Sequence, residues 1–175
     1  MTLYSIALFV HVLGALLLFV TLTVEGVALR MLHRAAATEA ALGAAALLRV
    51  NRIVGPLSAL GVLIPGLYMT ATSWGWVAWI VVALVTWVVI AVLGAVNGIR
   101  ILALERSQAF LTGIRNPMFV ISWMARVGIA LGVVFLMTVK PGAVAAVLAI
   151  VISAAGGAAL GIGLSKVRGM RGQVA

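Results

Sequence analysis

Apolar residues fill long stretches of this chain, and polar residues gather in the short segments between them. A helix needs about 20 consecutive apolar residues to cross the hydrocarbon core of a membrane. Five stretches meet this requirement, so the pattern predicts five membrane-spanning helices. They lie at residues 3–29, 53–72, 76–99, 117–139 and 143–164.

Composition leads to the same fold class. Of the 175 residues, 65% are hydrophobic and 9% are charged, whereas soluble domains are about half apolar and about a quarter charged. A water-soluble core of this length cannot hide so much apolar surface, so we expect lipid to be the solvent. The first stretch follows no basic segment and ends in no small-residue cleavage site, which favours a retained helix over a signal peptide. The sequence thus predicts an all-α, polytopic transmembrane helical bundle in which residues 1–175 form a single domain.

Basic residues gather in the connections on one side of the predicted spans. The connection at 30–52 holds four Arg and one Glu, the connection at 100–116 holds three Arg and one Glu, and the tail adds one Lys and two Arg. The other side has Lys140 alone. Since Lys and Arg are enriched in cytoplasmic loops, we expect the N-terminus outside and the C-terminus inside. Aromatic residues that favour the headgroup layer gather at the predicted outer edge and support this topology. They are Tyr4, Tyr68, Trp74, Trp76 and Trp79.

Several classes of function do not fit the sequence. The net charge of +9 comes from short basic clusters without interleaved aromatic residues, so we expect no nucleic-acid partner. The absence of Cys excludes disulfides, thiol catalysis and thiolate metal sites. Neither a Ser/His/Asp arrangement, nor a carboxylate pair, nor a phosphate-binding glycine pattern is present. We therefore expect no enzyme and assign no dedicated metal site.

Two features bear on the shape of the predicted helices. The Ala-rich connection at 35–48 contains strong helix formers and no Pro. It is predicted to be helical, either as an extension of the first two spans or as a helix on the inner membrane surface. Pro65 lies inside the second span, where its ring is expected to kink the helix.

Glycines recur four residues apart in three predicted spans. This small-xxx-small spacing lets membrane helices approach each other closely. Two alternatives are open: packing within the bundle, or a face for self-association or for docking of a partner. The pairs are Gly94 with Gly98, Gly128 with Gly132, and Gly157 with Gly161.

The polar candidates for function inside the predicted spans are three ionisable residues, His11, Glu25 and Arg126, and the amide Asn97. Ionisable groups within a membrane are costly and mark functional sites by default. Glu25 and Arg126 both lie toward the inner ends of their spans, and a long Arg side chain reaches along its helix. We therefore predict an ion pair between them, direct or bridged by water. Its role is open between locking the first and fourth spans together and forming a gate or proton-linked site.

His11 lies near the middle of the first span, about 21 Å along the helix axis from Glu25, so these two residues cannot touch. Three roles are open for His11: a hydrogen bond to a hydroxyl or carbonyl group, a proton relay, or a ligand to haem, another tetrapyrrole or copper. His33 lies about 33 Å further along, so one chain cannot supply two axial histidines to one haem. Met69 and Met137 lie toward the predicted outer side, and their thioethers together with His11 suit copper(I).

Three segments resemble a known family. The opening "HVLGALLLF" resembles the His-x-Leu-Gly start of an uncharacterised family of small bacterial integral membrane proteins. "GPLSALGVLIPGLYM" and "WGWVAWIVVALVTWVV" resemble the second and third spans of that family, so the resemblance covers residues 3–105. It implies a helical membrane fold without an established activity. The first span is also distantly similar to that of copper-resistance membrane proteins, which implies metal handling, although this chain has no further intramembrane histidine.

These observations leave three functional hypotheses. The leading one is a non-catalytic, multi-pass protein of a bacterial inner membrane, acting as an accessory or scaffolding subunit of a membrane complex or as a small homo-oligomer. The second is a small proton- or ion-linked transporter that uses Glu25, Arg126 and His11. The third is a tetrapyrrole- or copper-binding membrane protein with His11 as ligand. The expected partners are the lipid bilayer and other membrane subunits or further copies of the chain.

Overall fold

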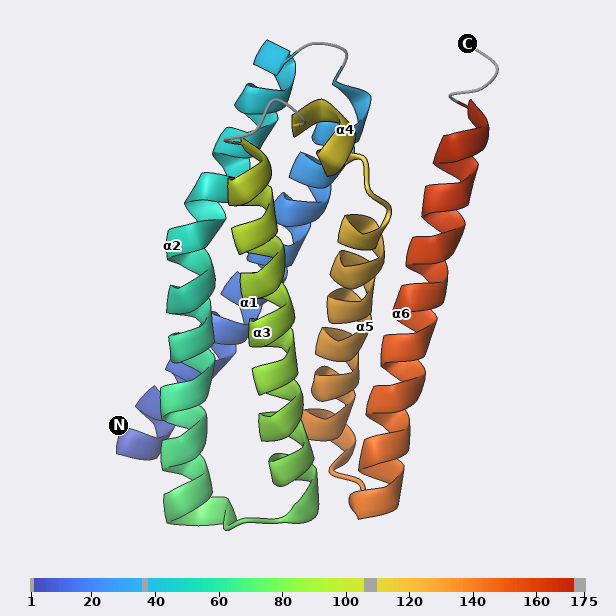
Figure 1. Cartoon of the computed structure of the whole chain (residues 1–175). Helices are drawn as coiled ribbons and strands as arrows, with labels where there is room; N and C mark the ends of the chain where they lie inside the picture. The colour runs from blue at the N-terminus through green and yellow to red at the C-terminus, as the bar shows by residue number, and fades with distance from the viewer. Residues whose placement is uncertain (1, 36–37, 106–109, 172–175) are drawn as a thin grey trace.

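The computed structural model describes residues 2–35, 38–105 and 110–171, and the regular structure among them is entirely helical (Figure 1). Five helices are long and apolar enough to cross a membrane, which confirms the predicted all-helical fold and the number of candidate spans. The elements are α1 (Leu3–Arg34), α2 (Thr38–Met69), the π-helical turn η1 (Thr70–Trp74), α3 (Ala78–Glu105), α4 (Phe110–Ile114), α5 (Met118–Val139) and α6 (Ala143–Arg171).

The first two helices extend well past their predicted spans. α1 continues to Arg34, before the Ala-rich connection begins. α2 begins at Thr38, so the connection is helical from residue 38 on and extends the second span; residues 36 and 37 lie outside the described ranges. Each of these helices has 32 residues and is about 48 Å long, whereas the hydrocarbon core is about 30 Å thick. α2 runs on through Pro56 and Pro65, and Figure 1 shows its first part tilted against the rest.

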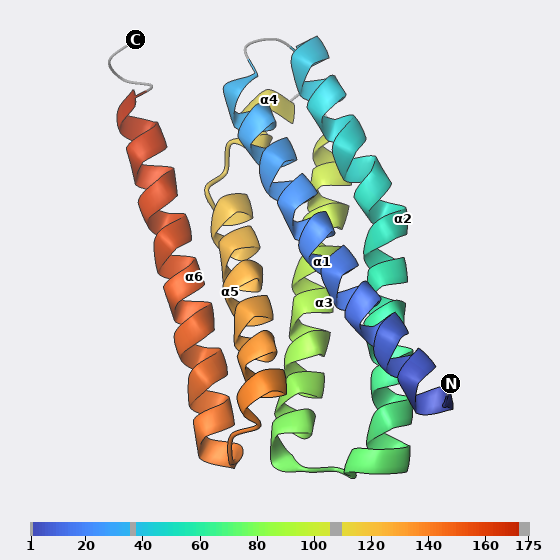
Figure 2. The ribbon, with the colours of Figure 1, turned by 180° about the vertical axis from the view of Figure 1, so that it is seen from behind.

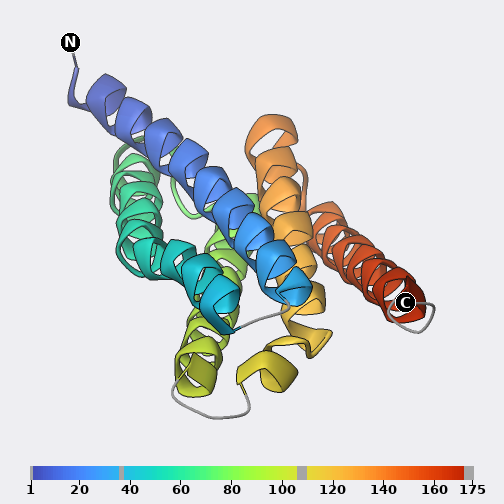
Figure 3. The same ribbon diagram turned by 90° about the horizontal axis from the view of Figure 1, so that it is seen from above.

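The helices form two groups. α1 packs mainly on α2, and α5 packs mainly on α6 with α3 on its other side. Figures 1 and 2 show that α1 crosses the bundle diagonally, whereas α3, α5 and α6 run more nearly side by side. Figure 3, a view from above, shows α3 between α2 and the α5–α6 pair. α2 and α3 contact each other little, so the space between the two groups is available for a cavity.

Glycines bring α1 and α2 together. A Cβ atom added to Gly14 would lie 2.6 Å from the carbonyl carbon of Gly61, closer than real Cβ atoms approach other heavy atoms. The two backbones therefore touch at this crossing. Small residues allow such close approach between membrane helices, whose association lipid does not drive through the hydrophobic effect.

Glycines also form the contact between α5 and α6. A Cβ atom at Gly128 would overlap the carbonyl oxygen of Ser153, and one at Gly157 would overlap the carbonyl oxygen of Met124. A Cβ atom at Gly161 would lie 2.8 Å from Ile121 Cα, and one at Gly132 would lie 3.0 Å from the Ile150 side chain. Of the two alternatives for these four glycines, the structure shows packing within the bundle.

The two ends of the bundle differ in chemistry. At one end, which we call the aromatic end, Trp74 Nε1 donates a hydrogen bond to the hydroxyl oxygen of Tyr4 at 3.1 Å. The rings of Trp74 and Trp79 form a T-shaped pair, with their centroids 5.9 Å apart. Lys140 Nζ lies 4.1 Å from the centroid of the same Trp74 ring, within reach of a cation–π interaction.

The opposite end holds the connection from α1 to α2, the end of α3, and α4. We call it the basic end because it carries Arg30, Arg34, Arg49, Arg52 and Arg115. Arg115 Nη2 donates to the carbonyl oxygen of Ala35 at 3.3 Å and so ties α4 to the end of α1. Arg106 and the side chains of Arg168 and Arg171, which also entered the charge analysis, lie outside the described part of the chain.

A buried apolar cluster lies at the basic end, beneath these arginines. Leu32 on α1, Ala41 on α2 and Ile114 on α4 are completely buried in it. Phe110 and Phe119 close it from the side of α4 and α5. The cluster thus joins the ends of the long helices to α4.

Candidate functional site

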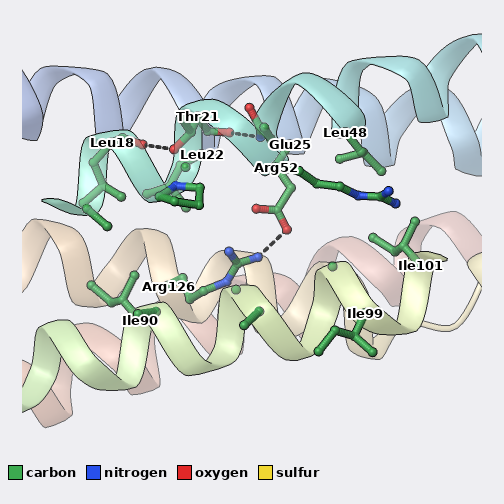
Figure 4. Close-up of a pocket in the computed structure, with 18 of the residues that line it drawn as sticks. Leu18, Thr21, Leu22, Glu25, Leu48, Arg52, Ile90, Ile99, Ile101 and Arg126 are labelled. Carbon is green, nitrogen blue, oxygen red and sulfur yellow. Dashed lines mark hydrogen bonds and ion pairs between the residues drawn. The ribbon is translucent and has the colours of Figure 1, made fainter. Parts of the chain in front are cut away.

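The ion pair predicted between Glu25 and Arg126 is present and direct. Arg126 on α5 donates from Nη2 to Oε1 of Glu25 on α1 (Figure 4). The side chains are 5% and 12% exposed for Arg126 and Glu25. Gly94 on α3 leaves room for the guanidinium, since a Cβ atom there would lie 3.2 Å from Arg126 Nη1.

This pair leaves one donor of Arg126 without a partner. The Nε atom of Arg126 is buried and has no hydrogen-bond partner among the described residues. Burying a charged donor is costly unless it is both paired and hydrogen-bonded. The carboxylate of Glu25 offsets the charge of Arg126, but the unmet Nε–H remains a cost of burying this side chain.

The ion pair lines a cavity of about 650 Å³ bounded by α1, α2 and α3, which we call the ion-pair cavity. Its wall is largely apolar. Its polar groups include Asn51 and Arg52 on α2, in addition to the ion pair. Asn51 Nδ2 donates to the carbonyl oxygen of Thr21 at 2.7 Å and holds α2 against α1 beside the cavity.

Sequence reasoning missed Asn51 and Arg52. Both precede residue 53, where the predicted second span begins, so they were assigned to a connection and Arg52 counted only as a topology charge. In the structure α2 already includes them. Arg52 Nη2 lies 3.7 Å from Oε2 of Glu105 at the end of α3, and the Arg52 side chain remains 38% exposed. The predicted helical character of the 35–48 connection is the signal that could have found them, because a helix that begins before the span carries Asn51 and Arg52 into the bundle.

Of the two alternatives for Gly94 and Gly98, packing against another helix of the bundle is not seen among the described residues. A Cβ atom at Gly98 would meet nothing within 4 Å, and Gly94 faces the Arg126 side chain instead of a helix backbone. Both glycines line the ion-pair cavity. Small-xxx-small spacing shows that a helix surface is open to close approach, but it does not show whether a helix or a cavity faces that surface.

Asn97 was expected as a polar companion near the inner end of the third span. Its side chain is buried, and Nδ2 donates to Ser122 Oγ at 3.1 Å. Asn97 thus links α3 to α5 and does not line the ion-pair cavity. This contact explains how the bundle accommodates a polar amide, because Asn97 and Ser122 form a hydrogen bond with each other away from lipid.

His11 makes the carbonyl hydrogen bond that was one of its three open roles. Its Nδ1 lies 2.8 Å from the carbonyl oxygen of Val62 on α2. A carbonyl oxygen only accepts, so in a neutral ring Nδ1 carries the proton and Nε2 keeps its lone pair. Gly66 leaves space for the ring, because a Cβ atom there would lie 3.2 Å from it. His33 lies about six turns away, near the other end of α1, with Nδ1 2.8 Å from the Leu29 carbonyl oxygen.

His11 lines a second cavity of about 320 Å³, which we call the histidine cavity. Met69 and Met137 line the same cavity, together with Lys140 at the aromatic end. The structure therefore brings together the imidazole and the two thioethers that sequence analysis considered for copper(I). The described residues contain no group of three or more His, Cys, Asp or Glu that could hold a metal ion. Trp87 lines both cavities, so the two adjoin at this side chain.

Comparison with known proteins adds no relative. The chain matches no protein-family model, and no curated protein or solved structure is significantly similar to it. The resemblances to small bacterial membrane proteins and to copper-resistance proteins therefore stay predictions. The chemistry of the two cavities is the basis on which a function can be argued.

Proposed function

We propose that this chain is a non-catalytic, multi-pass protein of a bacterial inner membrane that binds a small ligand within its helical bundle and moves it in a proton- or ion-linked manner. The observation that supports this proposal is the buried Glu25–Arg126 pair lining the ion-pair cavity. Intramembrane ionisable residues that face a cavity mark substrate, ion and proton pathways. An accessory or scaffolding subunit, the leading hypothesis from sequence, needs no such cavity.

The proposed pathway has two polar stations. Glu25 and Arg126 form one, and His11 in the histidine cavity forms the other, about 21 Å away along α1. Trp87 separates the stations, because it lines both cavities. A proton on Glu25, or an anion beside Arg126, would break the ion pair and release α1 from α5 at this point. Binding and a change in helix packing are thereby coupled.

The proposal includes the orientation inferred from charge. The basic end faces the cytoplasm and the aromatic end faces outward, in line with the enrichment of Lys and Arg in cytoplasmic loops. The ion-pair cavity then lies toward the cytoplasmic leaflet and the histidine cavity toward the outer leaflet.

Proton flux into liposomes tests the proposal. Full-length protein is reconstituted into liposomes holding a pH-sensitive dye, and a potassium diffusion potential is imposed. We expect faster proton entry than in protein-free liposomes, and a slower protein-dependent rate for Glu25→Gln, whose amide oxygen still accepts from Arg126. Glu39→Gln is the matched control, because Glu39 is exposed and lies outside both cavities. Equal rates with and without the protein would refute proton-linked transport.

A second candidate function is copper(I) binding, favoured by the presence of His11, Met69 and Met137 around one cavity. Imidazole and thioether groups are ligands that suit copper(I). The test is a competition between the purified protein and a copper(I) chelator under reducing conditions. His11→Ala is expected to lose the bound copper, and His33→Ala to retain it. An absorption spectrum of the same preparation would reveal a tetrapyrrole bound through His11.

The accessory-subunit hypothesis has one structural feature in its favour. α6 packs mainly on α5 and leaves large apolar residues exposed along its other face. They include Val144, Val151, Ile152 and Leu160. Purification in mild detergent tests this candidate: a stoichiometric second protein, or a defined homo-oligomer, would support it over the ligand-carrying proposal.

A further inference from the structure

The ion-pair cavity is elongated and open on one side. Its lining on α3 runs from Trp87 to Leu102, which corresponds to about 22 Å of helix. Exposed residues recur at every fourth position along both rims, and α2 and α3 contact each other little. The rim residues are Arg52, Pro56 and Leu60 on α2, and Ala91, Ala95 and Ile99 on α3. The cavity therefore opens sideways between α2 and α3, toward the surrounding lipid.

Polar and apolar groups are separated along this cavity. Figure 4 shows Arg52 toward one end, the Glu25–Arg126 pair in the middle, and Leu18 and Ile90 at the other end. Two guanidinium groups and one carboxylate line the cavity, so its charged lining is net positive. The Arg52 side chain is 38% exposed despite the carboxylate of Glu105 nearby, and it remains open to a further anion.

The middle of the cavity offers a hydrogen-bond donor in addition to charge. Arg126 lines the cavity, and its Nη1 lies 3.2 Å from where a Cβ atom would stand on Gly94, another lining residue. An occupant that combines an anionic group, an uncharged oxygen acceptor and a long apolar chain would match these three regions in order. A glycerophospholipid has this arrangement: phosphate, ester carbonyl oxygens and acyl chain.

We propose that the ion-pair cavity binds an anionic glycerophospholipid, which enters sideways from the leaflet at the basic end. The phosphate pairs with Arg52, an ester oxygen accepts from Arg126 Nη1, and one acyl chain follows the apolar wall toward Trp87. Basic pockets between transmembrane helices on the cytoplasmic side bind anionic headgroups in this manner. The inference rests on the proposed function, because it names the class of ligand that enters the cavity.

Native mass spectrometry of the delipidated full-length protein tests this inference. The protein in mild detergent is titrated with phosphatidylglycerol or with phosphatidylcholine carrying the same acyl chains. We expect phosphatidylglycerol to bind the first site about fivefold more tightly, the contribution of one basic residue near an anionic lipid. Arg52→Gln is expected to abolish this preference. Arg49→Gln removes the same charge from an exposed position of α2 outside the cavity and is expected to keep it.

A second variant tests the location independently of charge. A Cβ atom at Gly98 would meet nothing within 4 Å, so Gly98→Leu fills the cavity without displacing a neighbouring helix. We expect this variant to remain folded, as followed by circular dichroism, and to lose the tight adduct with either lipid.

Three results would overturn the inference. The first is equal binding of the two lipids, and the second is an equal loss of the phosphatidylglycerol preference in Arg49→Gln and Arg52→Gln. The third is the formation of dimers instead of lipid adducts, when these dimers disappear in Gly98→Leu. The last result would assign the cavity to a second copy of the chain. The flux experiment is separate. A lipid preference without proton flux supports this inference and refutes proton-linked transport, whereas flux without a lipid preference refutes this inference alone.

Discussion

Trp123 on α5 donates a hydrogen bond from Nε1 to the carbonyl oxygen of Leu22 on α1, at 2.8 Å. Three residues further along each helix, Arg126 pairs with Glu25. Because α1 and α5 run in opposite directions (Figure 1), these two contacts join the helices at about the same level, one through a backbone acceptor and one through a carboxylate. The Trp123 contact aligns α5 with α1, so Arg126 reaches Glu25 in the middle of the bundle.

The first prediction concerns this alignment. Trp123→Phe keeps most of the aromatic ring but removes the donor, and we expect the free energy of unfolding to fall by about 0.5–1.5 kcal/mol, the net contribution of one hydrogen bond. Unfolding by a denaturing detergent, titrated into protein in mild detergent, measures the change. Trp76→Phe is the control, because Trp76 is 64% exposed. Equal losses in the two variants would show that the Leu22 contact contributes no stability.

The second prediction concerns the ion pair. Removing one partner of a buried pair leaves an uncompensated charge and costs about 3–5 kcal/mol. We therefore expect Glu25→Leu and Arg126→Leu each to destabilise the protein strongly. The double variant buries no charge, so it is expected to be more stable than Glu25→Leu, in which Arg126 is left unpaired. Measuring all four proteins in the same unfolding assay gives the coupling energy, and additive losses would argue against a direct interaction.

The third prediction uses two adjacent glycines on α6. A Cβ atom at Gly157 would overlap the Met124 carbonyl oxygen, whereas one at Gly156 would meet nothing within 4 Å. Gly157→Ala is therefore expected to push α6 away from α5 and lower the thermal unfolding temperature in mild detergent. Gly156→Ala is expected to leave that temperature unchanged or raise it slightly, because Ala favours the helix over Gly. The reverse order of stability would contradict the α5–α6 contact.

The fourth prediction concerns topology. The chain has no Cys, so single cysteines can be introduced at Gly43 and Gly142, two exposed positions at opposite ends of the bundle where an added Cβ meets nothing. With the basic end in the cytoplasm, a membrane-impermeant maleimide should label Gly142→Cys in intact cells. Gly43→Cys should react only after the membrane is permeabilised. The opposite labelling pattern would reverse the proposed orientation.

Features that follow from a large energetic cost of placing particular residues in lipid could be predicted from the sequence. The spans follow from the length of apolar stretches, and the Glu25–Arg126 pair follows from the cost of leaving either charge unpaired in lipid. Contacts made through the backbone could not be predicted, because a carbonyl acceptor such as that of Val62 or Leu22 is present in every residue. The partner of His11 was found only when the fold placed α2 beside it.

The residues that line the ion-pair cavity could not be predicted from the sequence pattern either. Gly94 and Gly98 have the spacing of a helix contact, yet the weak contact between α2 and α3 leaves Gly98 facing open space and Gly94 facing the Arg126 side chain. Arg52 resembled a topology signal, because the hydropathy of the second span begins after it. Both assignments depend on how two helices diverge, which is a tertiary property with no marker in either helix alone.

The apolar cluster around Leu32 and Ile114 implies that two different forces hold this molecule together. Lipid provides no hydrophobic drive between helices, but the cluster lies at the basic end, which in the proposed topology reaches the aqueous phase, so that the exclusion of water stabilises it. A chaotrope dissolved in the aqueous phase should loosen α4 and the ends of the long helices first, while the glycine contacts within the bilayer persist. The protein would then come apart from one end, in two stages.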